Sequence, residues 1–256
     1  MSYFGQPKIT KTNRPDSTPY TVYYPHTIPQ NNRNWTQDYV QYVSIDPAIK
    51  NYAFRIERRY HNGWITPVAF DKVNINEREV VEDVTVIKTY ENLTIFLEQF
   101  RELYNDCHYI IIERQLPHNY QMVRIQQHTI SYFSILLHNK PLLPAIIDVC
   151  PKLKGQVLKA PKNITYNQLK QWTIQIGRQL LEERQDNYSL SVLEKYRNKQ
   201  DDLCDTIIQA EALFRLWGWE PIKTNVTLNV VRETNKDILT DENYTVVNIP
   251  VTDIVD

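Results

Sequence analysis

The run Tyr109-Ile-Ile-Ile-Glu113 decides the fold that this sequence is expected to adopt. It is short and continuously apolar up to its last residue, which is typical of a strand that is buried on both faces of a sheet. Pro144-Ala-Ile-Ile-Asp-Val149 has the same character. Apolar residues recur with helical spacing around these runs, in 94–104, 119–137, 165–183 and about 200–217. Strands that alternate with helices indicate an α/β protein whose sheet carries helices on both faces.

Three further strands are predicted before this region, at 40–45, 51–58 and 64–70. Asn62-Gly63 is a strong signal for a hairpin between the last two. Because Pro67 has no amide hydrogen to donate, the last of the three is expected at an edge of the sheet. A hairpin region followed by alternating strands and helices predicts a mixed sheet of five strands.

The composition divides the chain into three parts. Residues 1–38 are rich in Pro, Thr, Asn and Tyr without an apolar period, so they are expected to form a flexible or extended N-terminal arm. Residues 39–218 contain the predicted α/β domain. Residues 219–256 form an acidic C-terminal extension, in which 226–231 and 244–251 alternate and could be extra strands or part of an arm.

The net charge of −1 argues against binding of anions through a general excess of positive charge. The charges are unevenly distributed, because the segment from Arg114 to Leu181 holds nine Lys or Arg residues and one acid, Asp148. This asymmetry predicts a basic surface for a polyanion. A dipolar surface without a ligand is the alternative.

The sequence also predicts where the protein is found. It has no apolar run of about 18 residues, so no membrane span is expected. No charged segment followed by an apolar one is visible at the start, so no signal peptide is expected. Cys107, Cys150 and Cys204 lack metal-ligand spacing and cannot all pair, which indicates reduced thiols. An intracellular protein that is not secreted is therefore expected.

Acidic residues stand at the ends of two predicted strands. Asp46 ends the first strand, and Glu113 ends the fourth. If these strands are parallel neighbours, both side chains emerge at the same carboxyl edge of the sheet, where open α/β sheets bind ligands. Simpler interpretations exist, since an Asp before Pro47 is a common turn-former and Glu113 could be a solvated strand end.

A third acidic group begins the last predicted helix, in Lys199-Gln-Asp-Asp-Leu-Cys-Asp205. Spacings of three and four residues put Asp202 or Asp201 on one helical face with Asp205. Asp201 could instead be the helix cap. Four converging carboxylates repel one another unless cations lie between them, and such oxygen ligands favour Mg²⁺ or Mn²⁺. Two divalent ions would create a site for phosphodiester cleavage.

Five segments, in this order, resemble the RuvC-like Holliday junction resolvases: Ser44-Ile-Asp-Pro-Ala-Ile-Lys-Asn51, Ile111-Ile-Glu-Arg-Gln115, Gln127-His-Thr-Ile-Ser-Tyr-Phe133, Pro151-Lys-Leu-Lys-Gly155 and Lys199–Asp205. The resolvases of poxviruses, of other large DNA viruses and of fungal mitochondria look most similar. The resemblance covers about residues 40–218. Two positions depart from it, because many relatives have Gly in place of Ala48 and Ala in place of Cys204.

The resemblance implies an RNase H-like fold, a homodimer, and an Mg²⁺-dependent nuclease in which Mn²⁺ substitutes. Such enzymes nick two opposed strands of a four-way junction, so the implied partner is branched double-stranded DNA. Carried over by motif, the catalytic residues and ligands of two ions are Asp46, Glu113, Asp202 and Asp205. Asp202 is preferred over Asp201 because two residues separate this pair in the family. If the protein is viral, a cytoplasmic replication site in the host cell or the virion is implied.

Basic residues are expected to hold the DNA backbone: Arg114, Lys152, Lys154, Lys159 and Lys162. The four lysines are expected on a loop after the fifth strand, beside the acidic edge. Lys154 could also offset charge that develops on the scissile phosphate. The apolar residues of 129–137 could form a dimer contact, although a core helix has the same pattern.

Two other functions are compatible with the sequence. The chain could be an RNase H-like nuclease for RNA–DNA hybrids or other branched DNA. Two-metal chemistry acts on the phosphodiester group and does not by itself distinguish a junction from another substrate. It could also be a non-catalytic packaging or structural protein that reuses the fold. Retention of all four acids argues against the last possibility, because a scaffold gains nothing from their repulsion.

Overall fold

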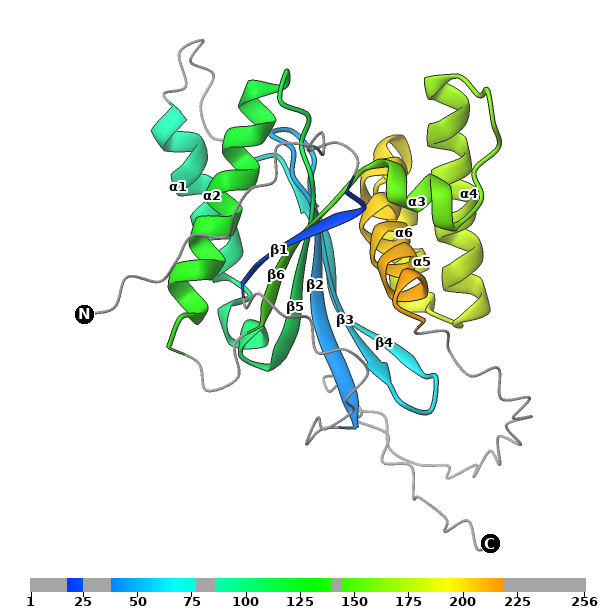
Figure 1. Cartoon of the computed structure of the whole chain (residues 1–256), viewed down its shortest axis with the longest axis horizontal. Helices are drawn as coiled ribbons and strands as arrows, with labels where there is room; N and C mark the ends of the chain where they lie inside the picture. The colour runs from blue at the N-terminus through cyan, green and yellow to red at the C-terminus, as the bar shows by residue number, and fades with distance from the viewer. Residues whose placement is uncertain (1–17, 25–37, 77–85, 140–143, 219–256) are drawn as a thin grey trace, which may run out of the picture. The chain divides into compact units, whose positions relative to one another are not determined.

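The computed structural model describes residues 18–24, 38–76, 86–139 and 144–218, which belong to a unit spanning Met1–Lys223. Within these residues, one six-stranded sheet has the spatial order β1-β6-β5-β2-β3-β4 (Figure 1). The strands are β1 (Tyr20–Tyr24), β2 (Tyr39–Asp46), β3 (Tyr52–Tyr60), β4 (Ile65–Val73), β5 (Cys107–Glu113) and β6 (Ala145–Val149). The two alternating segments predicted near the C-terminus lie outside the described residues.

The sheet is mixed, as predicted. The strands β2, β5 and β6 are parallel neighbours, whereas β3 and β4 extend the sheet as an antiparallel hairpin. The turn at Asn62-Gly63 connects this hairpin, and Pro67 lies in the edge strand β4 next to a shift in the β3–β4 register. An edge with a local irregularity is where a residue without an amide hydrogen costs least.

One strand was not predicted. β1 pairs antiparallel with β6 and makes the sheet six-stranded rather than five-stranded. It lies in the segment 1–38 that composition alone assigns to an arm. Only five residues long, β1 is too short to show a period, but pairing covers the amides and carbonyls that β6 would otherwise leave at an open edge.

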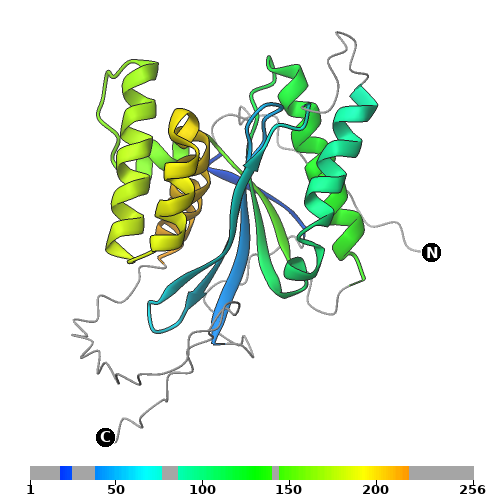
Figure 2. The same cartoon turned by 180° about the vertical axis from the view of Figure 1, so that it is seen from behind.

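Helices cover both faces of the sheet (Figures 1 and 2). One face carries α1 (Val86–Glu98) and α2 (Tyr120–Leu137); the other carries α3 (Lys152–Val157), α4 (Tyr166–Glu183), α5 (Asn187–Lys195) and α6 (Gln200–Leu216). Two 3₁₀ helices, η2 (Arg101–Asp106) and η3 (Arg197–Lys199), complete the described elements. No helix of the described part of the chain has the length and apolar character that spanning a membrane requires.

The predicted helices at α2, α4 and α6 are confirmed. The helix expected over 94–104 is instead the end of α1 followed by η2, because 3₁₀-type hydrogen bonds from Gln99 and Phe100 close the α-helix. α5 was missed; it is a short helix of nine residues that Asp186 caps by accepting a hydrogen bond from the Ser189 amide.

The apolar run of β5 is buried on both faces of the sheet. Ile110 and Ile112 pack in a core under α1 and α2. Tyr109 and Ile111 face the opposite way and pack in a second core with Phe214 of α6. This alternation explains why the run from Tyr109 has no polar position before Glu113.

Candidate active site

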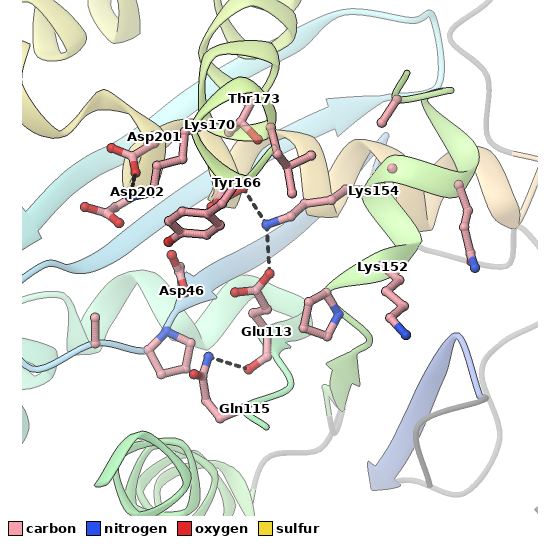
Figure 3. A pocket seen from close by; sticks show the side chains of 18 of the residues that line it. Asp46, Glu113, Gln115, Lys152, Lys154, Tyr166, Lys170, Thr173, Asp201 and Asp202 are labelled. Carbon is pink, nitrogen blue, oxygen red and sulfur yellow. Dashed lines mark hydrogen bonds and ion pairs between the residues drawn. The ribbon is translucent and has the colours of Figure 1, made fainter. Parts of the chain in front are cut away.

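Asp46 and Glu113 are the last residues of β2 and β5. Because these strands are parallel neighbours, both carboxylates lie at the same carboxyl edge of the sheet. Asp202 and Asp205 come from the first half of α6. The structure brings all four acidic residues to the lining of one cavity of about 980 Å³. Figure 3 shows Asp46, Glu113 and Asp202 in this cavity.

Hydrogen bonds fix α6 against the end of β2. The Ser44 hydroxyl donates to the Thr206 carbonyl (2.6 Å), and the Gln209 side-chain amide donates to the Ile45 carbonyl (2.9 Å). These contacts lie next to Asp46 in β2 and next to Asp205 in α6. They therefore set the position of one carboxylate relative to the other.

The Lys154 ammonium lies between two of the acids. Its Nζ is 2.8 Å from Glu113 Oε1 and 2.5 Å from Asp205 Oδ1, and the lysine is buried. Lys154 and Lys152 belong to the short helix α3, which corrects the prediction that they lie on a loop. One ammonium thus faces two carboxylates and has Asp46 nearby.

The acidic cluster holds more negative charge than Lys154 offsets. Burial, followed by the charges of Glu113 and Asp205, raises the pKa of Asp46 well above its usual value. Burial also raises the pKa of Asp205 to about 6, with the Lys154 ammonium opposing the shift and Glu113 adding to it. Both shifts show that the folded protein disfavours the ionised carboxylates in the absence of a further cation.

Asp202 and Asp201 have different environments. Among the described residues, Asp202 Oδ2 is buried without a hydrogen-bond partner, and burial raises the pKa of this carboxyl, with the charge of Asp201 adding to the shift. Asp201 instead pairs with Lys170 of α4 at 2.5 Å. The prediction that Asp201 is the helix cap is wrong, because α6 begins at Gln200 and its N-cap position is Lys199.

The donor chemistry of the cavity fits a hard divalent cation. Among the described residues, Asp202 Oδ2 has no hydrogen-bond partner, and the pKa of Asp46 is raised although the Lys154 ammonium opposes the shift, so both carboxylates could accept a further cation. Within the described ranges, no three acidic, His or Cys side chains are already grouped to hold one metal ion. The Lys154 ammonium already contacts Glu113 and Asp205, two of the four carboxylates that would hold such an ion.

The predicted DNA-binding residues separate into two groups. Lys152, Lys154, Lys159 and Lys162 all line the cavity with the acids. Arg114 has a different environment: its guanidinium pairs with Asp148 (2.6 Å) and donates to the Thr21 hydroxyl (2.7 Å). Arg114 therefore joins β1 to β6 and is not among the residues that line the cavity. Its contact with DNA stays a prediction.

Tyr166 is one of the cavity residues that sequence reasoning missed. It begins α4, its side chain is exposed, and its ring lies 5.1 Å from the Lys170 ammonium. Figure 3 shows it among the acidic side chains. The sequence contains seventeen tyrosines, so nothing in its local pattern distinguishes this one.

Two uncharacterised viral proteins are similar in sequence to this chain. No protein-family model matches the chain. Protein 170L of Invertebrate iridescent virus 6, itself uncharacterised, is 27% identical over 178 residues, which cover 60% of this chain and 71% of that protein. Protein 97L of Invertebrate iridescent virus 3, also uncharacterised, is 24% identical over 128 residues, 49% of this chain and 55% of that protein.

Among solved structures, the yeast mitochondrial Holliday junction resolvase Ydc2 is similar with a TM-score of 0.50 and 18% identity, over 70% of this chain and 80% of that one. RuvC of Thermus thermophilus has a TM-score of 0.43 and 9% identity, over 69% of this chain and 96% of its own. The likeness to Ydc2 shows that the described residues share the mixed α/β fold of that protein.

Proposed function

We propose that this chain is a structure-selective DNA endonuclease that resolves four-way junctions and other branched DNA. The observation that carries the proposal is the meeting of Asp46, Glu113, Asp202 and Asp205 in one cavity, whose lining among the described residues also includes five lysines. Site chemistry rather than fold supports a nuclease, because one fold serves many functions. The resolvase fold supports the choice of a junction as substrate.

The proposed cofactor is Mg²⁺, for which Mn²⁺ substitutes, with two ions held by the four carboxylates. Bound ions of this kind activate the attacking water and stabilise the leaving oxygen in phosphodiester hydrolysis. Asp202 is proposed as a ligand because its Oδ2 is buried and lacks a hydrogen-bond partner within the part of the chain that the structure describes. Asp201 is not proposed, because Lys170 neutralises it.

The lysines of the cavity would hold the substrate. Lys152 and Lys159 are exposed and can contact phosphates on the approaching strand. Lys154 is buried among the acids and can donate to the scissile phosphate, where negative charge develops. Lys162 extends the same basic lining.

Junction cleavage tests the proposal directly. Purified protein with Mg²⁺ is expected to cut a synthetic four-way junction in symmetric pairs, and Asp202→Asn is expected to abolish cutting while it preserves junction binding. Asp201→Asn is the matched control: it makes the same chemical change one residue away and is expected to retain cutting. Junction binding without cutting at every Mg²⁺ and Mn²⁺ concentration would exclude the proposal.

The substrate class and the assembly need separate measurements. Cutting of an RNA–DNA hybrid in preference to the junction would favour the RNase H-like alternative, and calorimetry without divalent-ion binding would favour a non-catalytic protein. Paired cuts need two active sites, so a homodimer is proposed and sedimentation tests it. Ile135 of α2, which is 72% exposed, is available for such a contact. The viral relatives support a role in viral DNA processing, at a replication site in the host cytoplasm or in the virion.

A further inference from the structure

A second cavity, of about 300 Å³, lies where β4 meets the end of α5 and η3. Four cationic residues line this β4–η3 pocket: Lys72, Lys195, Arg197 and Lys199. The proposed active site uses none of them, and they fall outside the basic segment from Arg114 to Leu181. The pocket is therefore a separate concentration of positive charge.

Tyr196 organises the β4–η3 pocket. Its hydroxyl donates to Asp71 Oδ1 (2.6 Å), which fixes the ring against β4. The ring centroid lies 5.2 Å from the Lys72 ammonium and 4.9 Å from the Lys195 ammonium. Lys72 also donates to the Lys199 carbonyl (3.3 Å), so the Lys72 and Lys195 ammonium groups are placed by contacts of the fold rather than dispersed over a solvated surface.

Among the described residues, the pocket lining contains one carboxylate, Glu194. Glu194 pairs with Arg197 at 3.3 Å and also with Arg178 of α4. The Arg197 side chain is nevertheless 80% exposed. The pocket thus presents a net positive charge outward, with exposed groups that can reach a ligand.

The β4–η3 pocket adjoins the acidic site. Lys199 directly precedes α6, and the positive charges of Lys72 and Lys199 act on the Asp202 carboxyl. Lys152 lies beyond Glu113, away from Asp201 and Asp202 (Figure 3). Basic groups therefore lie on both sides of the acidic residues, with Lys72 and Lys199 beside Asp202 and Lys152 beyond Glu113.

We propose that the β4–η3 pocket binds backbone phosphates of the nucleic-acid strand, on the side of the acids opposite α3. The inference rests on the proposed function for the identity of the polyanion. A strand that crosses the acids is positioned for attack only if its backbone is held on both sides of the scissile phosphate. Lysine and arginine contacts to phosphate fix position without reading sequence, so the contact would be independent of sequence.

The experiment compares two double variants in junction binding. Arg197→Gln with Lys199→Gln removes one Arg and one Lys from the pocket. Lys88→Gln with Arg101→Gln removes the same two residue types from α1 and η2, where each pairs with a single glutamate. Binding of a fluorescent four-way junction is measured by anisotropy in EDTA, across a range of salt concentrations, with thermal melting as the check on folding.

The pocket variant is expected to reduce the slope of log affinity against log salt by about 2, since each phosphate contact contributes about 0.9. It is also expected to weaken binding about tenfold or more at about 0.1 M salt, and the control variant far less. Lys195→Gln alone provides a second test and is expected to reduce the slope by about 1. Equal losses in the pocket and control variants, or no loss in either, would overturn the inference.

The outcome is separable from the proposed function. Selective loss of binding by the pocket variant, with no junction cutting by the wild type, would refute the endonuclease and retain the pocket. Cutting by the wild type, with unchanged junction binding by the pocket variant, would support the endonuclease and refute the phosphate-binding role of the pocket.

Discussion

Lys154 offsets part of the negative charge of the acidic site. Its ammonium contacts Glu113 and Asp205 in a buried position, where an unpaired charge is costly. Among the described residues, Asp46 and Asp202 receive no comparable contact and have raised pKa values. A lysine in this position both stabilises the metal-free protein and competes for oxygens that a divalent ion would use.

Replacing Lys154 by Met separates these two effects. Lys154→Met leaves Glu113 and Asp205 facing each other without a cation, so the metal-free protein is expected to lose about 3 kcal/mol of unfolding free energy. The variant is also expected to bind Mg²⁺ more tightly, because the competing ammonium is gone. Denaturant unfolding in EDTA and calorimetric titration with Mg²⁺ measure the two quantities.

Lys152→Met is the matched control, because Lys152 lines the same cavity from the same helix but is exposed. It is expected to change the unfolding free energy by less than about 0.5 kcal/mol. Weaker Mg²⁺ binding by Lys154→Met than by Lys152→Met would show that the ammonium supports the metal site instead of competing with it.

Strand ends made two of the acidic positions predictable from sequence. Asp46 and Glu113 end strands whose parallel pairing follows from the alternation of elements, and the pairing places both at one edge. Arg114 shows the limit of this reasoning. The side chains of adjacent residues in an extended chain point to opposite sides. Arg114 follows Glu113 directly, and its side chain therefore contacts Asp148 and does not enter the cavity.

At the scale of elements, α6 positions half of the acidic site. It is buried along most of its length and contacts both β2 and α4. α4 approaches α6 at Gly177, where an added Cβ would lie 2.7 Å from Cys204 Cβ and 2.7 Å from its Sγ. The absence of a side chain at this position therefore permits the close packing of the two helices.

Gly177→Ala is expected to destabilise the protein by about 2 kcal/mol, because the new methyl group overpacks the contact with Cys204. Cys204→Ala should not relieve the destabilisation that Gly177→Ala causes, since the Cβ at position 204 remains 2.7 Å from the new methyl group. Cys204→Gly should relieve it, because it removes both the Cβ and the Sγ that the methyl group would overlap. Chemical unfolding of the single and double variants tests this, and an equal cost of Gly177→Ala when it is combined with Cys204→Ala and with Cys204→Gly would contradict it.

Element length explains which elements the sequence could reveal. The helices α2 and α4 have eighteen residues each, enough for an apolar stripe to repeat several times. The strand β1 and the helix α5 have five and nine residues, and both gain stability from partners far away in the sequence. A short element leaves no periodic signal. The strand β6 is as short as β1, and it was predictable from its apolar run rather than from a period.

At the scale of the described fold, a buried ionic network joins the sheet to three helices on its α6 side. Arg55 of β3 contacts Glu57 (2.6 Å) and Asp186 at the start of α5 (2.7 Å). Arg59 contacts Glu211 of α6 at 2.8 Å, and Arg184 at the end of α4 contacts the same carboxylate at 2.6 Å. Charged residues that alternate along β3 resemble a solvated face in the sequence, but only the folded arrangement shows that they are paired and buried.

This network predicts how stability depends on pH. The surrounding guanidinium groups overcome burial and lower the pKa of Glu57 from 4.5 to about 2, and that of Glu211 likewise to about 2. Each carboxylate therefore contributes stability, up to about 3 kcal/mol, that is fully present above its unfolded pKa and is lost as the pH falls through the folded one. In urea unfolding, the midpoint of the wild type is expected to fall steeply between about pH 5 and about pH 2.5.

Glu57→Gln is expected to be less stable at neutral pH, and its urea midpoint is expected to fall less steeply with decreasing pH. Glu91→Gln, a surface change on α1, should keep the wild-type slope, and a slope in Glu57→Gln equal to that of Glu91→Gln would show that the buried pairs do not govern acid unfolding.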